Sequence, residues 1–216
     1  MSVTKTTGTQ FAIGSTYGAS KAMSAITNAA TAVATLEASH GVIVGDFIEL
    51  TSGWDLANGR VFRVSAVATN DVTLEGFDTS NTAKYPAGTG TGTVREITAW
   101  TTLSQITPGF SVAGGEQNFA DTTTVANQIR TQIPTDRNAI TVTLPFFFDP
   151  TLAWFATVRA AADAATPYAL RMVFPNNSRL VVGAYWSVRG VPTSEDSTLR
   201  DVIDLSFIGS PTIYST

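Results

Sequence analysis

The stretch HGVIVGDFIEL, residues 40–50, holds the residues whose types could do chemistry. His40 is the only histidine in the chain, and two carboxylates follow it within the stretch. An imidazole near carboxylates suits a general base or a metal ligand. Gly41 and Gly45, however, flank three apolar residues, and glycines there favour backbone bends at a strand end. The sequence therefore favours a structural corner, in which the histidine bonds to nearby backbone.

Other catalytic chemistry has little support. The chain has no cysteine, which removes disulfides and thiol chemistry, and one histidine cannot build a multi-histidine metal centre. The glycine-rich run Gly88–Thr93 lacks the lysine of a phosphate-binding loop and opens a strand instead of a helix. Asp46, Glu49 and Asp55 lie close in sequence, so the sequence does not exclude the pair of carboxylates that a glycosidase uses. We predict a protein that is not an enzyme and uses no cofactor or metal.

The composition excludes several broad classes. The 216 residues are 44% hydrophobic and 14% charged, enough for a sizeable core. No apolar run is long enough for a membrane span, and the start MSVTKTTGTQ has no apolar signal core, which argues against export. The net charge is −4 without a basic patch, so phosphate-driven binding of nucleic acid finds no support.

The pattern of turns predicts a mainly β protein. Threonine, valine and glycine are abundant, and β-branched residues suit a pleated surface. Turn signals at Asn58-Gly59, Thr69–Asp71 and Pro175–Ser178 separate alternating runs. This is a meander of hairpins.

One helix is expected after Asp149. That residue can cap the helix, and Pro150 suits its first position. An apolar stripe at helical spacing follows, formed by Leu152, Phe155, Val158 and Ala162. Such a helix packs one face on a sheet.

The order of the segments suggests an inserted module. Residues 23–97 read as short strands with tight turns, which we expect to form a small β-barrel-like module within a core of residues 1–22 and 98–216. The polar stretch from Glu116 to Asn138 is longer than most loops of compact domains, and such segments are usually functional or mobile.

The residues from 100 to the C-terminus resemble a known family. Residues 139–190 and 199–214 give a strand, a capped helix, two strands around an Asn-rich hairpin and a last strand ending in SFIGSP. This order resembles the core of the tail tube proteins of long-tailed bacteriophages, and residues 100–137 are similar to the strand pair and extended loop of that family. The 23–97 segment is similar to small β modules of phage virion proteins.

The resemblance implies a tail-tube-type β-sandwich or barrel with one flanking helix. It implies assembly of this chain into stacked hexameric rings in the host cytoplasm, location in the virion tail, and contact with other tail proteins such as the tape measure and terminator. DNA would pass through the lumen without specific binding, and no membrane is involved. The segment Gly114–Arg137 would reach a neighbouring ring or subunit through residues that include Glu116, Asp121, Arg130, Asp136 and Arg137.

A conduit must not bind its cargo, which constrains the charge of the lumen. One unbalanced lumen arginine per subunit would give six phosphate contacts per ring and a salt slope of roughly −5. On the last strand Asp204 and Ser206 share the face opposite Ile203 and Leu205. We expect Asp204 and Ser206, with Asp201 across the twist at the strand start, to face the lumen or an interface, balanced by Arg171.

Two alternatives remain open. The first is another virion component, such as a tail terminator or a decoration protein. The second is a carbohydrate-binding β-sandwich, for which the four tryptophans, Trp54, Trp100, Trp154 and Trp186, could offer stacking faces.

Overall fold

The computed structural model describes residues 7–126 and 129–215. The first six residues of MSVTKTTGTQ, on which the export argument partly rests, lie outside this part, as do residues 127 and 128 of the long polar stretch. The described chain is mostly antiparallel β-strand with one helix, which confirms the expected fold class.

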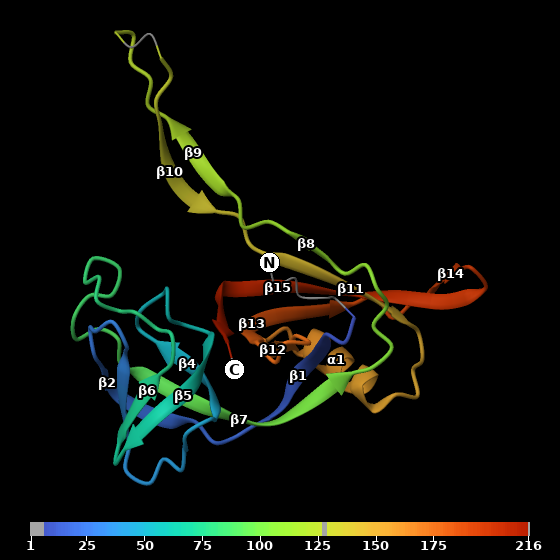
Figure 1. Cartoon of the computed structure of the whole chain (residues 1–216), viewed down its shortest axis with the longest axis horizontal. Coiled ribbons are helices and arrows are strands. Elements are labelled where there is room, and N and C mark those ends of the chain that lie inside the picture. Colours follow the sequence, from blue (N-terminus) through green and yellow to red (C-terminus); the bar gives the residue numbers. More distant parts are fainter. Residues whose placement is uncertain (1–6, 127–128, 216) are drawn as a thin grey trace.

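Figure 1 shows the order and arrangement of these elements. The first seven strands are β1 (Gln10–Tyr17), β2 (Lys21–Ile26), β3 (Val33–Leu36), β4 (Phe47–Ser52), β5 (Arg60–Ala68), β6 (Asp71–Leu74) and β7 (Gly92–Leu103). Then follow β8 (Ser111–Ala113), β9 (Gln117–Asp121), β10 (Gln132–Arg137), β11 (Thr141–Phe147) and the helix α1 (Ala153–Ala164). The chain closes with β12 (Tyr168–Val173), β13 (Arg179–Val188), β14 (Thr193–Glu195) and β15 (Thr198–Tyr214).

The larger part of the sheet has the order β7-β1-β12-β13-β15-β11-β8. Along each strand successive side chains point to opposite faces of the sheet. The helix α1 packs on one of these two faces. Together they enclose the largest core cluster, in which residues of α1 meet residues of β1, β11, β12, β13 and β15. We call this part the tube core.

The helix lies in the segment that the sequence predicted, but it begins later than expected. α1 begins at Ala153, and Leu152 occupies the N-cap without a side-chain cap bond. The carboxylate of Asp149 instead accepts hydrogen bonds from the N–H and the hydroxyl of Thr151, so it closes a local turn before the helix. The buried side of the helix includes Phe155 and Val158, as predicted.

The remaining strands form a closed barrel, which we call the module. Its order is β2-β3-β6-β5-β4-β7, and β2 also pairs with β7, which closes the sheet on itself. A second core cluster fills it, with Phe62 and Phe77 stacked at 4.5 Å between ring centroids. β7 runs through both parts, because its first half pairs with β2 and β4 and its second half with β1.

A third, smaller cluster joins the module to the tube core, and we call it the seam. It consists of Phe47 and Val61 from the module, Ile97 of β7, and Ala169, Val181 and Tyr214 from the tube core. The seam residues of β13 and β15 lie on the sheet face opposite α1. The module therefore covers one end of that outer face.

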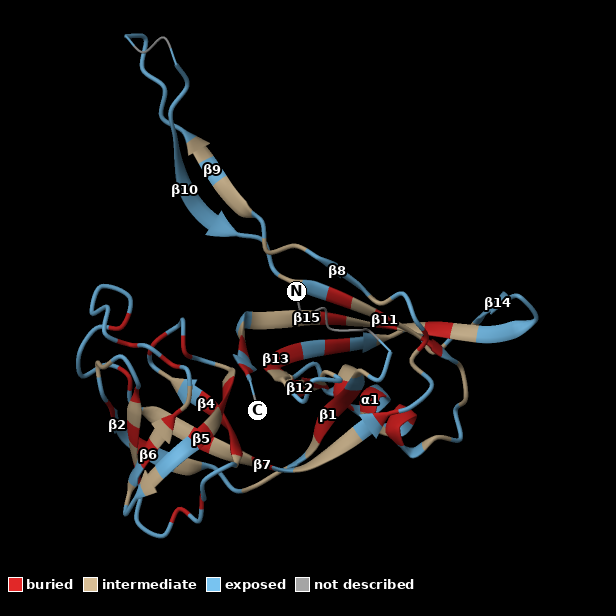
Figure 2. Ribbon diagram, in the orientation of Figure 1, coloured by how far each residue is buried: buried red, intermediate tan, exposed pale blue. Residues whose placement is uncertain are grey.

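The polar stretch after β8 folds into a hairpin of β9 and β10. These strands pair only with each other, and Figure 1 shows them extending away from the rest of the molecule. Gly114 and Gly115, at φ 82° and 84°, turn the chain out of the sheet. Figure 2 shows that the hairpin has almost no buried residue, so it lacks a core of its own.

Gly183 sets how closely the module approaches the tube core. A Cβ atom at this position would overlap with the backbone carbonyl oxygen of Gly59 in the module. We expect Gly183→Ala to push the two parts apart and lower the free energy of unfolding by about 1–3 kcal/mol. Urea unfolding monitored by tryptophan fluorescence measures this.

The matched control is Gly18→Ala, whose Cβ would meet its nearest neighbour at an ordinary 3.6 Å. Equal stability of the two variants would show that the close approach at Gly183 is unimportant.

Candidate assembly surfaces

The outer face of the tube core is polar where the module leaves it open. Asp204 on β15 lies between Thr143 of β11 and Ser187 of β13, and Ser206 lies between Thr141 and Tyr185. All of these side chains point away from α1, since the residues between them are buried in the core. We call these six residues the open face.

The open face is shallow and carries a single carboxylate. Its residues line a depression of about 370 Å³. The Thr143 hydroxyl donates a hydrogen bond to Asp204 Oδ1 at 2.7 Å, which orients the carboxylate along the sheet. Hydroxyl groups supply the rest of the polar surface, together with the phenol of the half-exposed Tyr185. The predicted face of Asp204 and Ser206 thus exists, and its orientation in an assembly stays a prediction.

Asp201 does not lie on this face. It pairs with Phe146 on the core side and is only 4% exposed. Its Oδ2 accepts the backbone N–H of Gly190 at 2.9 Å, and its Oδ1 accepts that of Val202 at 2.8 Å. The carboxylate is satisfied by backbone, so within one chain it fixes the turn after β13.

Arg171 lies too far from Asp204 to balance it within one chain. Arg171 pairs with Val181 on β13, whereas Asp204 pairs with Ser187 further along the same strand. Val181 and Ser187 are separated by about 20 Å, at a rise of roughly 3.3 Å per residue. Such a distance exceeds the screening length of about 8 Å at physiological ionic strength. Arg171 instead stacks over Trp100, with its guanidinium carbon 4.5 Å from the ring centroid, and burial lowers its pKa.

The charged residues predicted for the extended segment fall on the hairpin. Asp136 accepts bonds from Thr135 and Asn118, which lower its pKa, and Asp121 accepts bonds from Thr123 with the same effect. Near the base, Arg137 donates to the side chain of Gln117, and the Asn138 amide lies at the Glu116 carboxylate. The fifth residue, Arg130, is exposed towards the tip.

The hairpin also exposes apolar side chains that the sequence reading did not single out. They are Phe119, Val125, Ile129 and Ile133. A two-stranded hairpin is marginally stable in water, because it buries little apolar surface. Exposed apolar residues on such an element are typical of a surface that is completed by another protein.

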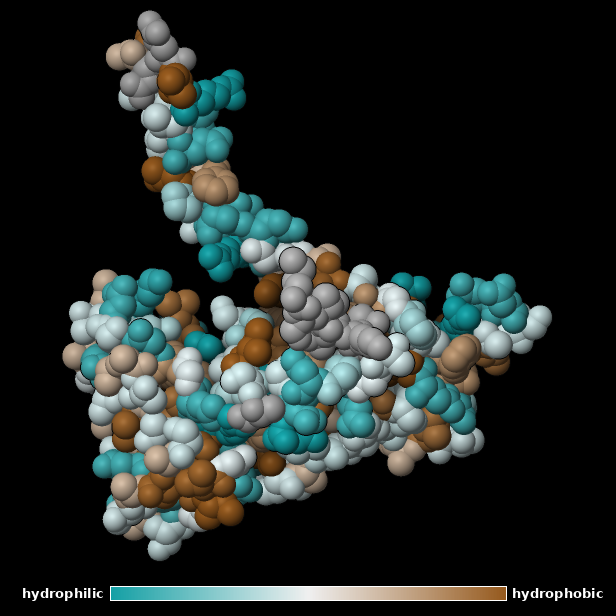
Figure 3. Space-filling model, viewed as in Figure 1, coloured by the Kyte–Doolittle hydropathy of each residue, from teal (hydrophilic) through white to brown (hydrophobic). Residues whose placement is uncertain are grey.

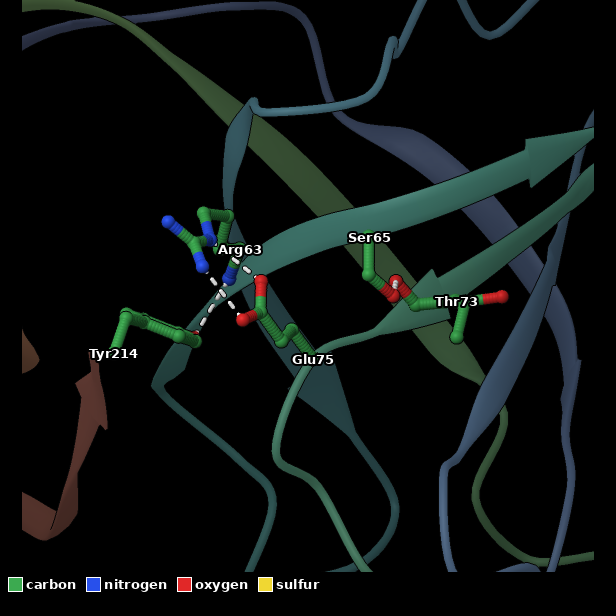
Figure 4. A network of polar contacts seen from close by, with 5 residues as sticks. All are labelled: Arg63, Ser65, Thr73, Glu75 and Tyr214. Atoms are coloured by element: carbon green, nitrogen blue, oxygen red, sulfur yellow. Dashed lines mark hydrogen bonds and ion pairs between the residues drawn. The ribbon is translucent and has the colours of Figure 1, made fainter. Parts of the chain in front are cut away.

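The seam is reinforced by two similar clamps, one of which Figure 4 shows. The hydroxyl oxygen of Tyr214 accepts the backbone N–H of Arg63 at 2.8 Å. The Arg63 guanidinium lies over the Tyr214 ring, at 4.7 Å, and forms a two-pronged ion pair with Glu75 at 2.5 and 2.6 Å. Planar guanidinium groups suit this combination of stacking and forked bonding.

The second clamp lies at another part of the seam, beside Ala169. The hydroxyl of Tyr17 accepts the backbone N–H of Ala169 at 2.8 Å, and burial raises the pKa of Tyr17. Arg95 lies over its ring at 4.7 Å and pairs with Glu49 at 2.7 Å. Glu49, one of the carboxylates near His40, is therefore part of a structural ion pair. Sequence reasoning missed both clamps, because no local pattern connects residues about 150 positions apart.

His40 is a structural corner, as its flanking glycines predicted. Its Nδ1 accepts the backbone N–H of Val42 at 3.1 Å, and its Nε2 lies 3.0 Å from the carbonyl oxygen of Thr69. Asp46 accepts the backbone N–H of Ile43 at 2.8 Å. Within residues 7–126 and 129–215, no group of three histidine or carboxylate side chains could hold a metal ion.

The tryptophans do not offer open stacking faces. Trp54, Trp154 and Trp186 are buried, and Trp100 lies under Arg171. The feature that suggested carbohydrate binding is thus used in packing. Among the described residues, no helix has the length and apolar character needed to cross a bilayer.

Comparison with known families identifies the class of protein. Residues 52–216 match the family described as "Phage tail tube protein, TTP", which is more than half of the chain. The chain belongs to this family and is a structural protein of a phage tail.

Among solved structures, one similar chain comes from the six-fold symmetrised cryo-EM structure of the anti-feeding prophage baseplate. It shares 9% identity with a TM-score of 0.39, over 54% of this chain and 84% of that one. No curated protein matches the sequence.

The Tyr214 clamp predicts a loss of stability in alkali. Burial raises the pKa of Tyr214 to about 12, although the Arg63 N–H counteracts this. The native state therefore holds the phenol proton more tightly than the unfolded chain, whose tyrosines ionise near pH 10. This contribution is complete below about pH 10 and is lost, by about 3 kcal/mol in total, as the pH rises through about 12.

Tyr214→Phe isolates this effect in urea unfolding at a series of pH values. At neutral pH the variant leaves the Arg63 N–H unpaired, so we expect about 1–3 kcal/mol lower stability than the wild type. Above pH 10 the gap should narrow. Tyr185→Phe, at an exposed tyrosine, should leave the stability unchanged both at neutral pH and above pH 10. A stability difference between Tyr214→Phe and the wild type that stays constant with pH would contradict the assignment.

Proposed function

We propose that this protein is a tail tube subunit that assembles with copies of itself into stacked, hexameric rings and forms the conduit for DNA ejection. The observation that carries the proposal is the β9–β10 hairpin, which projects from the subunit and leaves its apolar side chains more than half exposed. A segment of this kind becomes stable when a neighbouring subunit buries it. Membership of the tail tube family supports the same reading.

The open face is proposed as the lumen surface. Its hydroxyl groups and single carboxylate give a neutral to weakly acidic lining, which would not hold the phosphates of passing DNA. Asp201 is left out of this surface, because its carboxylate is buried and bonded to backbone. Arg171 is left out as well, because it stacks against Trp100 at the seam.

We further propose that residues 23–97 are an inserted module within a core formed by the flanking segments. Its separate core cluster and closed barrel support this division. The proposed partners are other copies of this chain, the tape measure protein and the terminator, with assembly in the host cytoplasm and final location in the virion tail. A terminator or decoration protein is the remaining alternative among virion components.

The first test is electron microscopy of the purified protein and of a double variant on the hairpin. We expect the wild type to form rings or tubes at high concentration, and Phe119→Ser with Ile133→Ser to stay monomeric, with thermal unfolding within a few degrees of the wild type, since both side chains are exposed. Thr135→Ser on the same hairpin removes one methyl group and should still assemble. Persistent wild-type monomers would overturn the proposal, and binding of glycans by them would favour the carbohydrate-binding alternative.

The second test concerns the lumen. Asp204→Lys places six cations in each ring, and six phosphate contacts correspond to a salt slope of roughly −5 in the affinity for DNA. We expect phage carrying this variant to eject DNA several-fold more slowly at low salt and to recover as salt is raised. Asp163→Lys, an equal charge change at an exposed position of α1, is the control. Equal ejection rates for the two variants would remove Asp204 from the lumen.

A further inference from the structure

The module presents an exposed apolar pair that packing within the subunit does not use. Ile43 and Val44, in the connection between β3 and β4, are 66% and 60% exposed. Figure 3 shows hydrophobic surface over this lower part of the module. Neighbouring aliphatic side chains at the tip of a tight turn are costly to leave in water, so a partner surface is expected for them.

The turn that carries the pair is held rigidly. His40 and Asp46 each accept a backbone N–H from within it, and His40 also bonds to the carbonyl of Thr69 on the next hairpin. Because Nδ1 accepts a hydrogen, Nε2 is the nitrogen that donates. Gly41 and Gly45 provide the positive φ angles, 78° and 96°, on either side. A surface fixed in this way loses little entropy when it binds.

The pair lies at the end of the subunit opposite to the hairpin. Figures 1 and 2 show the β3–β4 connection at the lower edge of the molecule and the tip beyond β9 and β10 at the upper edge. Head-to-tail stacking joins two different surfaces of the same chain, located at opposite ends. The hairpin and the turn satisfy this requirement.

The two surfaces also match in chemistry. The hairpin tip carries the exposed Ile129 followed by the cation of Arg130. Beside the turn are the carboxylates of Asp46 and Glu96, which lie close enough that Asp46 adds to the effect of burial in raising the pKa of Glu96. Each surface therefore has an apolar part beside a charged part, and the charge on the hairpin is opposite to the charge beside the turn. Matching of these charges would fix the direction of docking.

We propose that the Ile43–Val44 turn is the docking site for the β9–β10 hairpin of a second copy of this chain in the adjacent ring. This inference rests on the proposed function as a tube subunit. It assigns to the module a role in ring stacking, with Ile129 against the aliphatic pair and Arg130 facing Asp46 and Glu96.

Cysteine cross-linking tests the contact directly, since the chain has no cysteine of its own. Val44→Cys and Ile129→Cys are prepared as separate variants, mixed in equal amounts, assembled and oxidised. We expect a disulfide-linked dimer on non-reducing gels from assembled tubes, and none from unassembled subunits. The control replaces Val44→Cys by Leu56→Cys, at a residue that is 54% exposed elsewhere on the module.

The outcomes separate this proposal from the function on which it rests. Tubes without a cross-link above the Leu56→Cys control would overturn the docking site and leave the tube function intact. Wild-type protein that forms no tubes would overturn both. As a second arm, Arg130→Glu should shorten tubes at least several-fold and Glu96→Arg should restore them; failure of this rescue while cross-links form would remove the charge pair from the contact.

Discussion

The arrangement of the whole subunit depends on the apolar seam between the module and the tube core. Phe47 and Val61 from the barrel meet Val181 and Tyr214 from the large sheet, and β7 passes continuously through both parts. A continuous strand alone would leave the module free to twist about one connection. The seam, with its two tyrosine clamps, removes that freedom and fixes where the turns of the module lie relative to the hairpin.

The clamps show why polar groups can be placed in such a contact. Each tyrosine hydroxyl accepts a backbone N–H that would otherwise be buried without a partner. Each arginine over a ring is neutralised by a glutamate, Glu49 on the adjacent strand β4 for Arg95 and Glu75 directly after β6 for Arg63. An unpaired buried donor is expensive, whereas a satisfied one adds direction to the contact. The seam is therefore specific in register as well as apolar, which suits an element that must present distant surfaces reproducibly.

Local patterns predicted most of the fold and little of the contacts between distant segments. Turns at Asn58-Gly59 and after Pro175, and the apolar stripe of α1, depend on neighbouring residues and were confirmed. Asp201 was expected to share the face of Asp204 across a twist. β15 pairs with β11 without a register shift there, so within one chain Asp201 keeps the parity of Ile203 and is buried. The Tyr17 and Tyr214 clamps join segments about 150 residues apart, and no spacing in a single sequence indicates such pairs.

The side chains of β13 mark where the module stops covering the outer face of the tube core. Along β13 the outward side chains change from Val181 and Gly183, which the module covers, to Tyr185 and Ser187, which it does not. The inward residues Val182, Ala184 and Trp186 stay apolar throughout, because α1 and the core lie behind them. The outer face thus switches from apolar to hydroxyl-rich within four residues, at the edge of the module.

The open face carries little charge. A surface that was merely solvent-exposed would tolerate lysine and glutamate, yet the only charged residue of the open face is Asp204, which is bonded to Thr143. The low charge of this face is therefore a property that the proposed assembly, in which the face would be enclosed, accounts for.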